Sequence, residues 1–143
     1  MNSTAALVTL ETTVGDVMTT DLVTLKLDDT LRLADDLLNL AHLRHFPVMD
    51  GDRLAGIINQ DDLLHASMVS VARRPTDTPR EALGTVAVKD VMKPPASITR
   101  DISIHDAAEM MVDKGIECLL VMEGEKLAGL VTRTDLLREL AKR

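Results

Sequence analysis

The chain has 143 residues, of which 45% are apolar and 27% are charged, and these proportions are typical of one compact globular domain. Its formal net charge of −7 argues against nucleic acids and anionic membranes as partners, because both attract basic proteins. It contains no run close to the roughly 20 apolar residues of a membrane span, and residues 1–13 do not resemble a secretory signal. Cys118 is the single cysteine, which excludes an intrachain disulfide and agrees with the cytoplasmic location that we expect.

Two segments of the chain repeat each other at a nearly constant offset. Residues 14–18 (VGDVM) return as 88–92 (VKDVM), and residues 23–64 align with 96–137 without a gap. Such self-similarity is the signature of a duplicated structural unit. We therefore assign residues 1–13 to a tail or an extra strand, 14–70 to a first repeat, 71–87 to a linker and 88–143 to a second repeat.

The first repeat predicts one order of elements. Its apolar residues 31, 34, 38 and 41 recur at helical spacing, and Asp29 or Thr30 is the expected N-cap of that helix. Short apolar runs on either side of the turn 50–52 predict a hairpin. The expected elements are a strand over 23–25, a helix from about residue 31, strands over 46–49 and 54–58, and a last helix from about residue 60.

The second repeat predicts the same order. A strand is expected over 97–99, then a helix that Ser103 caps and Gly115 ends. The expected hairpin strands are 119–122 and 127–131, and the last helix begins near Arg133. Each repeat is thus β-α-β-β-α, and the fold class is α/β of the α+β type. Neither half has enough apolar surface to close a core alone, so we expect the halves to pack together.

Several short motifs point to one family. The opening Asp-Val-Met, His45–Val48 (HFPV), Gly56–Ile58 (GII) and the closing DDLL of residues 61–64 occur together, and residues 129–135 read GLVTRTD. The combination resembles the CBS domain, named after cystathionine β-synthase, from residue 14 to about residue 140. The resemblance implies two pseudo-symmetric repeats in a disc-like module, with two clefts that bind AMP, ADP, ATP or S-adenosylmethionine. It also implies a homodimer.

Thr132, Arg133 and Asp135 are the first candidate site. The carboxylate of Asp135 can accept hydrogen bonds from both ribose hydroxyls, the Thr132 hydroxyl can bond sugar or phosphate, and Arg133 adds positive charge at a helix N-terminus. The same spacing is also that of a capping box, which needs no ligand. The resemblance favours the nucleotide contact.

Asn59 and Asp62 are the equivalent pair in the first repeat. Asn59 departs from the family's Thr or Ser, which weakens this site. The resemblance implies that each cleft mixes the repeats. It adds Thr19, Thr20, the stretch up to Val23, and Leu43 to the Asp135 cleft, and it adds residues 93–96, including Ala96, and Ile116 to the Asp62 cleft.

Arg44 and His45 stand where family members place bases that contact phosphate, and Glu117 and Cys118 replace them in the second repeat. An acid there repels a phosphate, so the two clefts are expected to differ. A solvated Arg44 and a half-buried surface His45 account for the two residues equally well.

The leading hypothesis is a module that senses an adenosine compound and signals to an unknown protein partner. The alternative is a constitutive dimeric interaction platform with vestigial clefts. The resemblance implies a dimer face on the last helices, which carry Leu63, Leu64, Leu136 and Leu137, and packing within the monomer is expected to account for at least half of these leucines. We expect no enzyme, no required cofactor and no metal site, because no nucleophile–base arrangement or phosphate loop is present and the four histidines are scattered. Cys118 is expected to be an inert core residue, and Met110, Met111 and Met122 are expected to fill core space.

Overall fold

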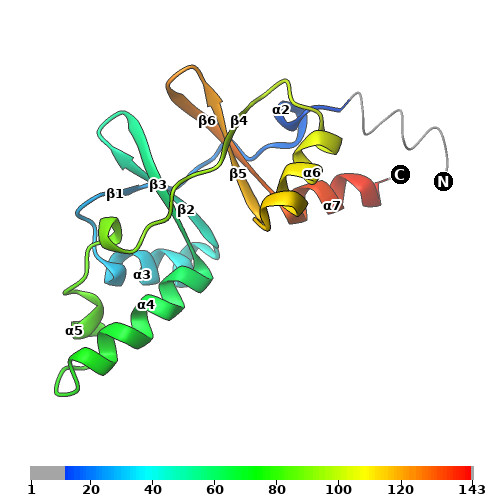
Figure 1. Cartoon of the computed structure of the whole chain (residues 1–143). Coiled ribbons are helices and arrows are strands. Elements are labelled where there is room, and N and C mark those ends of the chain that lie inside the picture. Colours follow the sequence, from blue (N-terminus) through cyan, green and yellow to red (C-terminus); the bar gives the residue numbers. More distant parts are fainter. Residues whose placement is uncertain (1–11, 143) are drawn as a thin grey trace. The chain divides into compact units, whose positions relative to one another are not determined.

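A computed structural model describes residues 12–142, and they divide into two compact units (Figure 1). The first-repeat unit comprises residues 23–95, and the second-repeat unit comprises residues 12–22 together with 96–142. The tail or strand expected near the N-terminus falls on residues 1–11, outside the described residues. None of the helices within residues 12–142 is long and apolar enough to cross a membrane.

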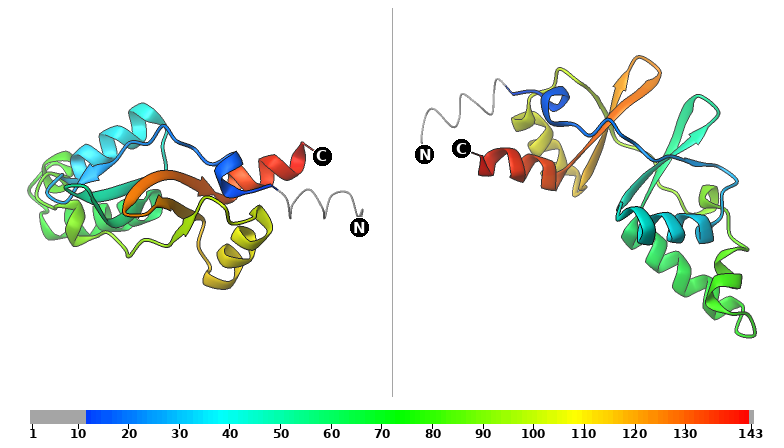
Figure 2. Two further views of the ribbon diagram at one scale, coloured as in Figure 1. Left: turned by 90° about the horizontal axis from the view of Figure 1, so that it is seen from above. Right: turned by 180° about the vertical axis from the view of Figure 1, so that it is seen from behind.

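The first-repeat unit is a three-stranded sheet with helices packed beside it. Its elements are β1 (Leu25–Lys26), α3 (Leu31–Ala41), β2 (His45–Asp50), β3 (Arg53–Asn59), α4 (Gln60–Arg73), α5 (Pro79–Leu83) and the 3-10 turn η1 (Val88–Asp90). The strand order is β1-β2-β3, with β1 parallel to β2 and β2 antiparallel to β3. Helices α3 and α4 lie side by side (Figures 1 and 2). This order confirms the expected β-α-β-β-α repeat.

The second-repeat unit has the same topology. Its elements are α2 (Val14–Val17), β4 (Ser97–Thr99), α6 (Ile104–Lys114), β5 (Cys118–Glu123), β6 (Lys126–Thr132) and α7 (Arg133–Ala141), with strand order β4-β5-β6. Helix α2 packs beside α7 (Figure 2). Ser103 caps α6 as expected, and Gly115 ends it at φ 64°, where a residue without Cβ avoids strain.

The predicted linker 71–87 contains the short helix α5. Thr78 and Glu81 form its capping box and Pro79 occupies its first turn. Ala82 and Leu83 on this helix are buried. Of the two prolines that indicated a linker, Pro79 therefore belongs to a helix start, whereas Pro75 lies between α4 and α5.

Each unit is completed by the segment that opens the other repeat in sequence. Residues 14–18 pack in the second-repeat unit, where Val14 N donates to Ile102 O at 2.8 Å. Residues 88–92 pack in the first-repeat unit, where Val88 N donates to Asp29 O at 2.7 Å. Val14 and Val88 are both fully buried. Each core therefore contains residues from the opening segment of the other repeat.

The exchanged segments continue along the last strand of each sheet. Thr19 and Leu130 exchange backbone hydrogen bonds of 2.8 and 3.0 Å, and Lys93 and Ile57 exchange two of 2.9 Å. This contact needs a glycine beneath it. A Cβ on Gly129 would lie 2.5 Å from Met18 Sδ, and a Cβ on the equivalent Gly56 would lie 2.6 Å from Met92 Sδ. Gly129 and Gly56 therefore leave the space that the side chains of Met18 and Met92 occupy.

Each unit has its own apolar core. Phe46, the single aromatic residue, is buried in the first core, and Met111 is buried in the second with Met110 packed against it, as expected. Each of the last helices, α4 and α7, has one buried and one exposed leucine in its adjacent pair. Leu63 and Leu136 are buried, whereas Leu64 on α4 and Leu137 on α7 are exposed.

Candidate functional site

Thr132 and Asp135 form a capping box where β6 passes into α7. The Asp135 N–H donates to Thr132 Oγ1 at 3.2 Å, and Asp135 Oδ2 accepts from the Thr132 N–H at 2.8 Å and from its hydroxyl at 3.0 Å. The Asp135 side chain is only 15% exposed, and Arg138 lies 3.7 Å from Oδ1. The capping geometry that the sequence offered as an alternative is therefore present, and it uses one of the two carboxylate oxygens.

Asn59 and Asp62 form the equivalent box where β3 passes into α4. Asn59 Oδ1 accepts from the Asp62 N–H at 2.8 Å, and Asp62 Oδ2 accepts from the Asn59 N–H at 3.1 Å. Asn59 therefore replaces threonine without loss of the helix start. The other oxygen, Asp62 Oδ1, lies 2.6 Å from the ammonium nitrogen of Lys93, and the Asp62 side chain is 7% exposed. The hydrogen bond with Asp62 raises the pKa of Lys93 above its ordinary value.

Thr19 and Lys93 occupy equivalent positions in the two units. Each pairs through its backbone with the strand residue two positions before the N-cap residue, Leu130 in one unit and Ile57 in the other. Both residues are exposed. Thr19 thus occupies the backbone position at which the other unit has the cationic Lys93.

The start of α7 carries an ion pair that sequence reasoning did not foresee. The Arg133 guanidinium donates to Glu117 Oε1 at 2.7 Å, and the Arg133 N–H donates to Glu117 O at 2.9 Å. Glu117, which we expected to repel a phosphate, is therefore balanced by the residue we expected to attract one. In the other unit Arg44 is exposed, and its carbonyl oxygen accepts the equivalent bond from Gln60 N at 2.9 Å.

The remaining predicted site residues divide between the two units. Thr19 and Thr20 share a unit with Asp135, whereas Val23 and Leu43 belong to the first-repeat unit and pack against its core. Ala96 and Ile116 belong to the second-repeat unit and pack against its core. Sets that join residues of both units stay a prediction.

Two hollows contain predicted site residues. One lies within the first-repeat unit and is lined by Leu38, Asn39, His42, Leu43, Arg44 and Gln60. The other lies within the second-repeat unit and is lined by Asp16, Val17, Asp135, Arg138, Glu139 and Lys142. The structure therefore brings Leu43 together with Arg44 at one hollow and places Asp135 at the edge of another. His45, the first residue of β2, is half-buried.

Cys118 begins β5 opposite Thr132 and is half-buried. Burial, with a smaller contribution from the charge of Asp135, raises the pKa of its thiol to about 12. The nucleophilic thiolate is therefore scarce at neutral pH, in agreement with the inert role expected from the sequence.

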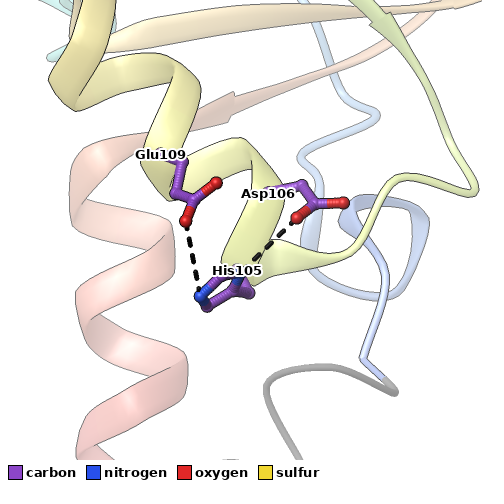
Figure 3. Close-up of side chains that lie close together, drawn as sticks. All are labelled: His105, Asp106 and Glu109. Carbon is purple, nitrogen blue, oxygen red and sulfur yellow. Dashed lines mark hydrogen bonds and ion pairs between the residues drawn. The ribbon is translucent and has the colours of Figure 1, made fainter.

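His105, Asp106 and Glu109 form a small polar cluster on the first turns of α6 (Figure 3). Their candidate ligand atoms lie within 4.8 Å of one another, and all three residues are exposed. The imidazole lies 3.4 Å from Asp106 Oδ1 and 3.7 Å from Glu109 Oε1. Contacts among exposed side chains of neighbouring residues on the first turns of one helix account for this arrangement.

Comparison with known proteins identifies the repeats. The family model of the CBS domain matches residues 14–69 and again residues 88–142. The chain belongs to the CBS-domain family. A CBS domain-containing protein of Dictyostelium discoideum is 33% identical over 132 residues, which are 90% of this chain and 91% of that protein. An A-adding tRNA nucleotidyltransferase of Geobacter sulfurreducens is 30% identical over 126 residues, which are 88% of this chain but only 13% of the enzyme.

A solved CBS-domain structure has the same fold. CBSX2 in complex with AMP superposes with a TM-score of 0.74 at 27% identity, over 92% of this chain and 97% of CBSX2. The family and the tandem mixed α/β fold inferred from the repeat are thereby confirmed.

Proposed function

We propose that this CBS-domain pair is a regulatory module that binds an adenosine compound at Thr132 and Asp135 and signals its occupancy to a protein partner. The observation that carries the proposal is the unused half of the Asp135 carboxylate. Helix capping occupies Oδ2, while Oδ1 has only a long contact of 3.7 Å to Arg138 within residues 12–142. A carboxylate oxygen that is mostly buried gains from a further hydrogen-bond donor.

A ribose supplies suitable donors. Its two neighbouring hydroxyls can both donate to one carboxylate, and hydrogen bonds to a charged acceptor are stronger than those between neutral groups. Thr19 is held beside β6 by two backbone hydrogen bonds, and the exposed Thr19 and Thr20 belong to the same unit as Asp135. The AMP complex of CBSX2 supports an adenosine compound as the ligand class.

Several finer statements belong to the same proposal. AMP, ADP, ATP and S-adenosylmethionine are its candidate ligands, and the site requires no cofactor and performs no catalysis. The predicted contacts of Arg133, Asn59, Asp62, Arg44, His45 and the four residues Val23, Leu43, Ala96 and Ile116 remain proposals. So do the repeat boundaries 14–70 and 88–143, a homodimer and a cytoplasmic location.

Calorimetric titration of the four candidate ligands tests the proposal. We expect binding by the wild type and a loss of at least about tenfold in affinity for Asp135→Ala, because a charge-assisted hydrogen bond contributes roughly 1.5–3 kcal/mol. Glu81→Ala is the matched control, because it removes the acidic partner of another capping box at α5 and leaves the site intact. No binding of any of the four ligands, or equal losses in the two variants, would contradict the proposal.

A second candidate function is a constitutive interaction platform. The observation in its favour is apolar surface on the two last helices, where Leu64 is 61% exposed and Met68 66% on α4, and Leu137 is 59% exposed and Leu140 46% on α7. Sedimentation of the wild type and of Leu64→Glu and Leu137→Glu would distinguish the two. A platform predicts a dimer that these variants dissociate, with none of the four ligands bound.

A further inference from the structure

The carboxylate of Asp62 is satisfied by the chain itself. Its Oδ2 accepts the Asn59 N–H at 3.1 Å, and its Oδ1 lies 2.6 Å from the ammonium nitrogen of Lys93. The Asp62 side chain is 7% exposed, so its negative charge is nearly removed from water. Separating Lys93 from a carboxylate buried to this extent would leave that charge without its partner, which is far more unfavourable than breaking an exposed pair.

The second-repeat unit has no lysine at the position of Lys93. Thr19 is the equivalent of Lys93, because its backbone exchanges two hydrogen bonds with Leu130 as that of Lys93 does with Ile57. The cation nearest Asp135 comes instead from Arg138, on the same helix, at 3.7 Å. One unit therefore closes its carboxylate with an internal cation, and the other leaves a carboxylate oxygen to an outside donor.

We propose that Lys93 determines the number of ligands by occupying Asp62, so that the chain binds one adenosine compound, at Asp135, and none at Asp62. This inference rests on the proposed function. A ribose that approached Asp62 would exchange a close ion pair for hydrogen bonds from neutral hydroxyls. At Asp135 the same hydroxyls displace only a long contact.

An opposite role for Lys93 is the alternative that the experiment must separate. Its side chain is 65% exposed, so the ammonium could turn away and hold a phosphate. That movement would leave Asp62 without its cation, and it would bring a phosphate toward Asp61, whose charge also acts on Lys93. Both consequences are unfavourable, which is why we assign Lys93 to closing the site.

Stoichiometry measured by calorimetry with AMP tests the inference. We expect one site per chain in the wild type and two in Lys93→Thr, with the added site within about tenfold of the first in affinity. Lys93→Thr/Asp62→Ala should return to one site. Thr19→Lys, which places the cation in the other unit, should weaken the wild-type site at least tenfold.

Lys89→Thr is the matched control. It removes the same charge from the same unit by breaking the exposed Lys89–Asp28 pair of 2.9 Å, and it should leave one site with unchanged affinity. Two sites in the wild type, one of them lost in Asp62→Ala, would overturn the inference and leave the proposed function standing. Weaker binding in Lys93→Thr would establish the phosphate role instead. Absence of AMP binding in both the wild type and Lys93→Thr would refute this inference together with AMP as the ligand.

Discussion

Substitution of Gly129 by alanine tests how the exchanged segment is held in the second-repeat unit. The added Cβ would lie 2.5 Å from Met18 Sδ and 3.0 Å from Thr19 O. Ordinary van der Waals contact begins near 3.4 Å. The sulfur must therefore move by roughly 1 Å, in a region where the Thr19 backbone is fixed by hydrogen bonds to Leu130.

The expected loss of stability follows from two opposing effects. Overpacking of this kind costs about 1–3 kcal/mol, whereas replacing glycine restricts the unfolded chain and stabilises the fold by about 0.4–1 kcal/mol. We expect a net loss of about 1–2 kcal/mol. For a chain of this length, that corresponds to a fall in Tm of roughly 3–8 °C. Urea and thermal unfolding followed by circular dichroism would measure both quantities.

A matched substitution and a double-mutant cycle complete the test. Gly84 has φ −70° and its nearest neighbour is the flexible Arg32 side chain, so Gly84→Ala should be neutral or slightly stabilising. Met18→Ala removes the group that Gly129→Ala strikes, so the double mutant should lose less stability than the sum of the single changes. Equal stability of Gly129→Ala and wild type, or additive losses in the cycle, would refute the contact between Met18 and Gly129.

Three further predictions concern the Cys118 thiol, the Asp16 carboxyl group and the N-caps of α7 and α4. Because the pKa of Cys118 is raised to about 12 from 9.0, its alkylation at pH 8 should be roughly a thousandfold slower in the folded than in the unfolded chain. The stability that the protonated thiol contributes should be present below pH 9 and be lost as the pH rises through about 12. Equally fast alkylation of the folded and unfolded chains would contradict this. Hydrogen bonds from the Thr13 N–H and hydroxyl lower the pKa of Asp16, so NMR titration should give a value below 3.8 that rises in Thr13→Val. The stability that the Asp16 carboxylate contributes is present above pH 3.8 and is lost as the pH falls through the lowered pKa. An unchanged pKa in Thr13→Val would exclude the hydroxyl bond. Thr132→Val removes an N-cap and should cost about 0.5–2 kcal/mol in unfolding experiments, whereas Asn59→Thr keeps one and should be nearly neutral.

Local patterns in the sequence predicted most of the fold. The helix from about residue 31, an N-cap at Asp29 or Thr30 and the C-cap at Gly115 follow from periodicity and capping chemistry, which act within a few residues. The structure places that N-cap at Thr30 and the C-cap at Gly115. The helix α5 was missed although Thr78, Pro79 and Glu81 are a helix-start pattern. Two prolines and mixed charges close together are typical of a linker as well as of a helix start.

The contacts that distinguish the two candidate sites could not be predicted in this way. Lys93 lies 31 positions after Asp62, and no periodicity connects them. Their ion pair depends on the exchanged segment running beside β3, which is a property of the tertiary fold. The repeat alignment did contain one usable signal, because residues 14–18 and 88–92 match and the next residues, Thr19 and Lys93, differ in charge.

The most direct test of a single adenosine site is a crystal structure of the chain grown with AMP. We expect one nucleotide per chain, with both ribose hydroxyls within hydrogen-bond distance of the Asp135 carboxylate and the Lys93–Asp62 pair unbroken. A nucleotide on Asp62, or one bound away from both carboxylates, would contradict the account.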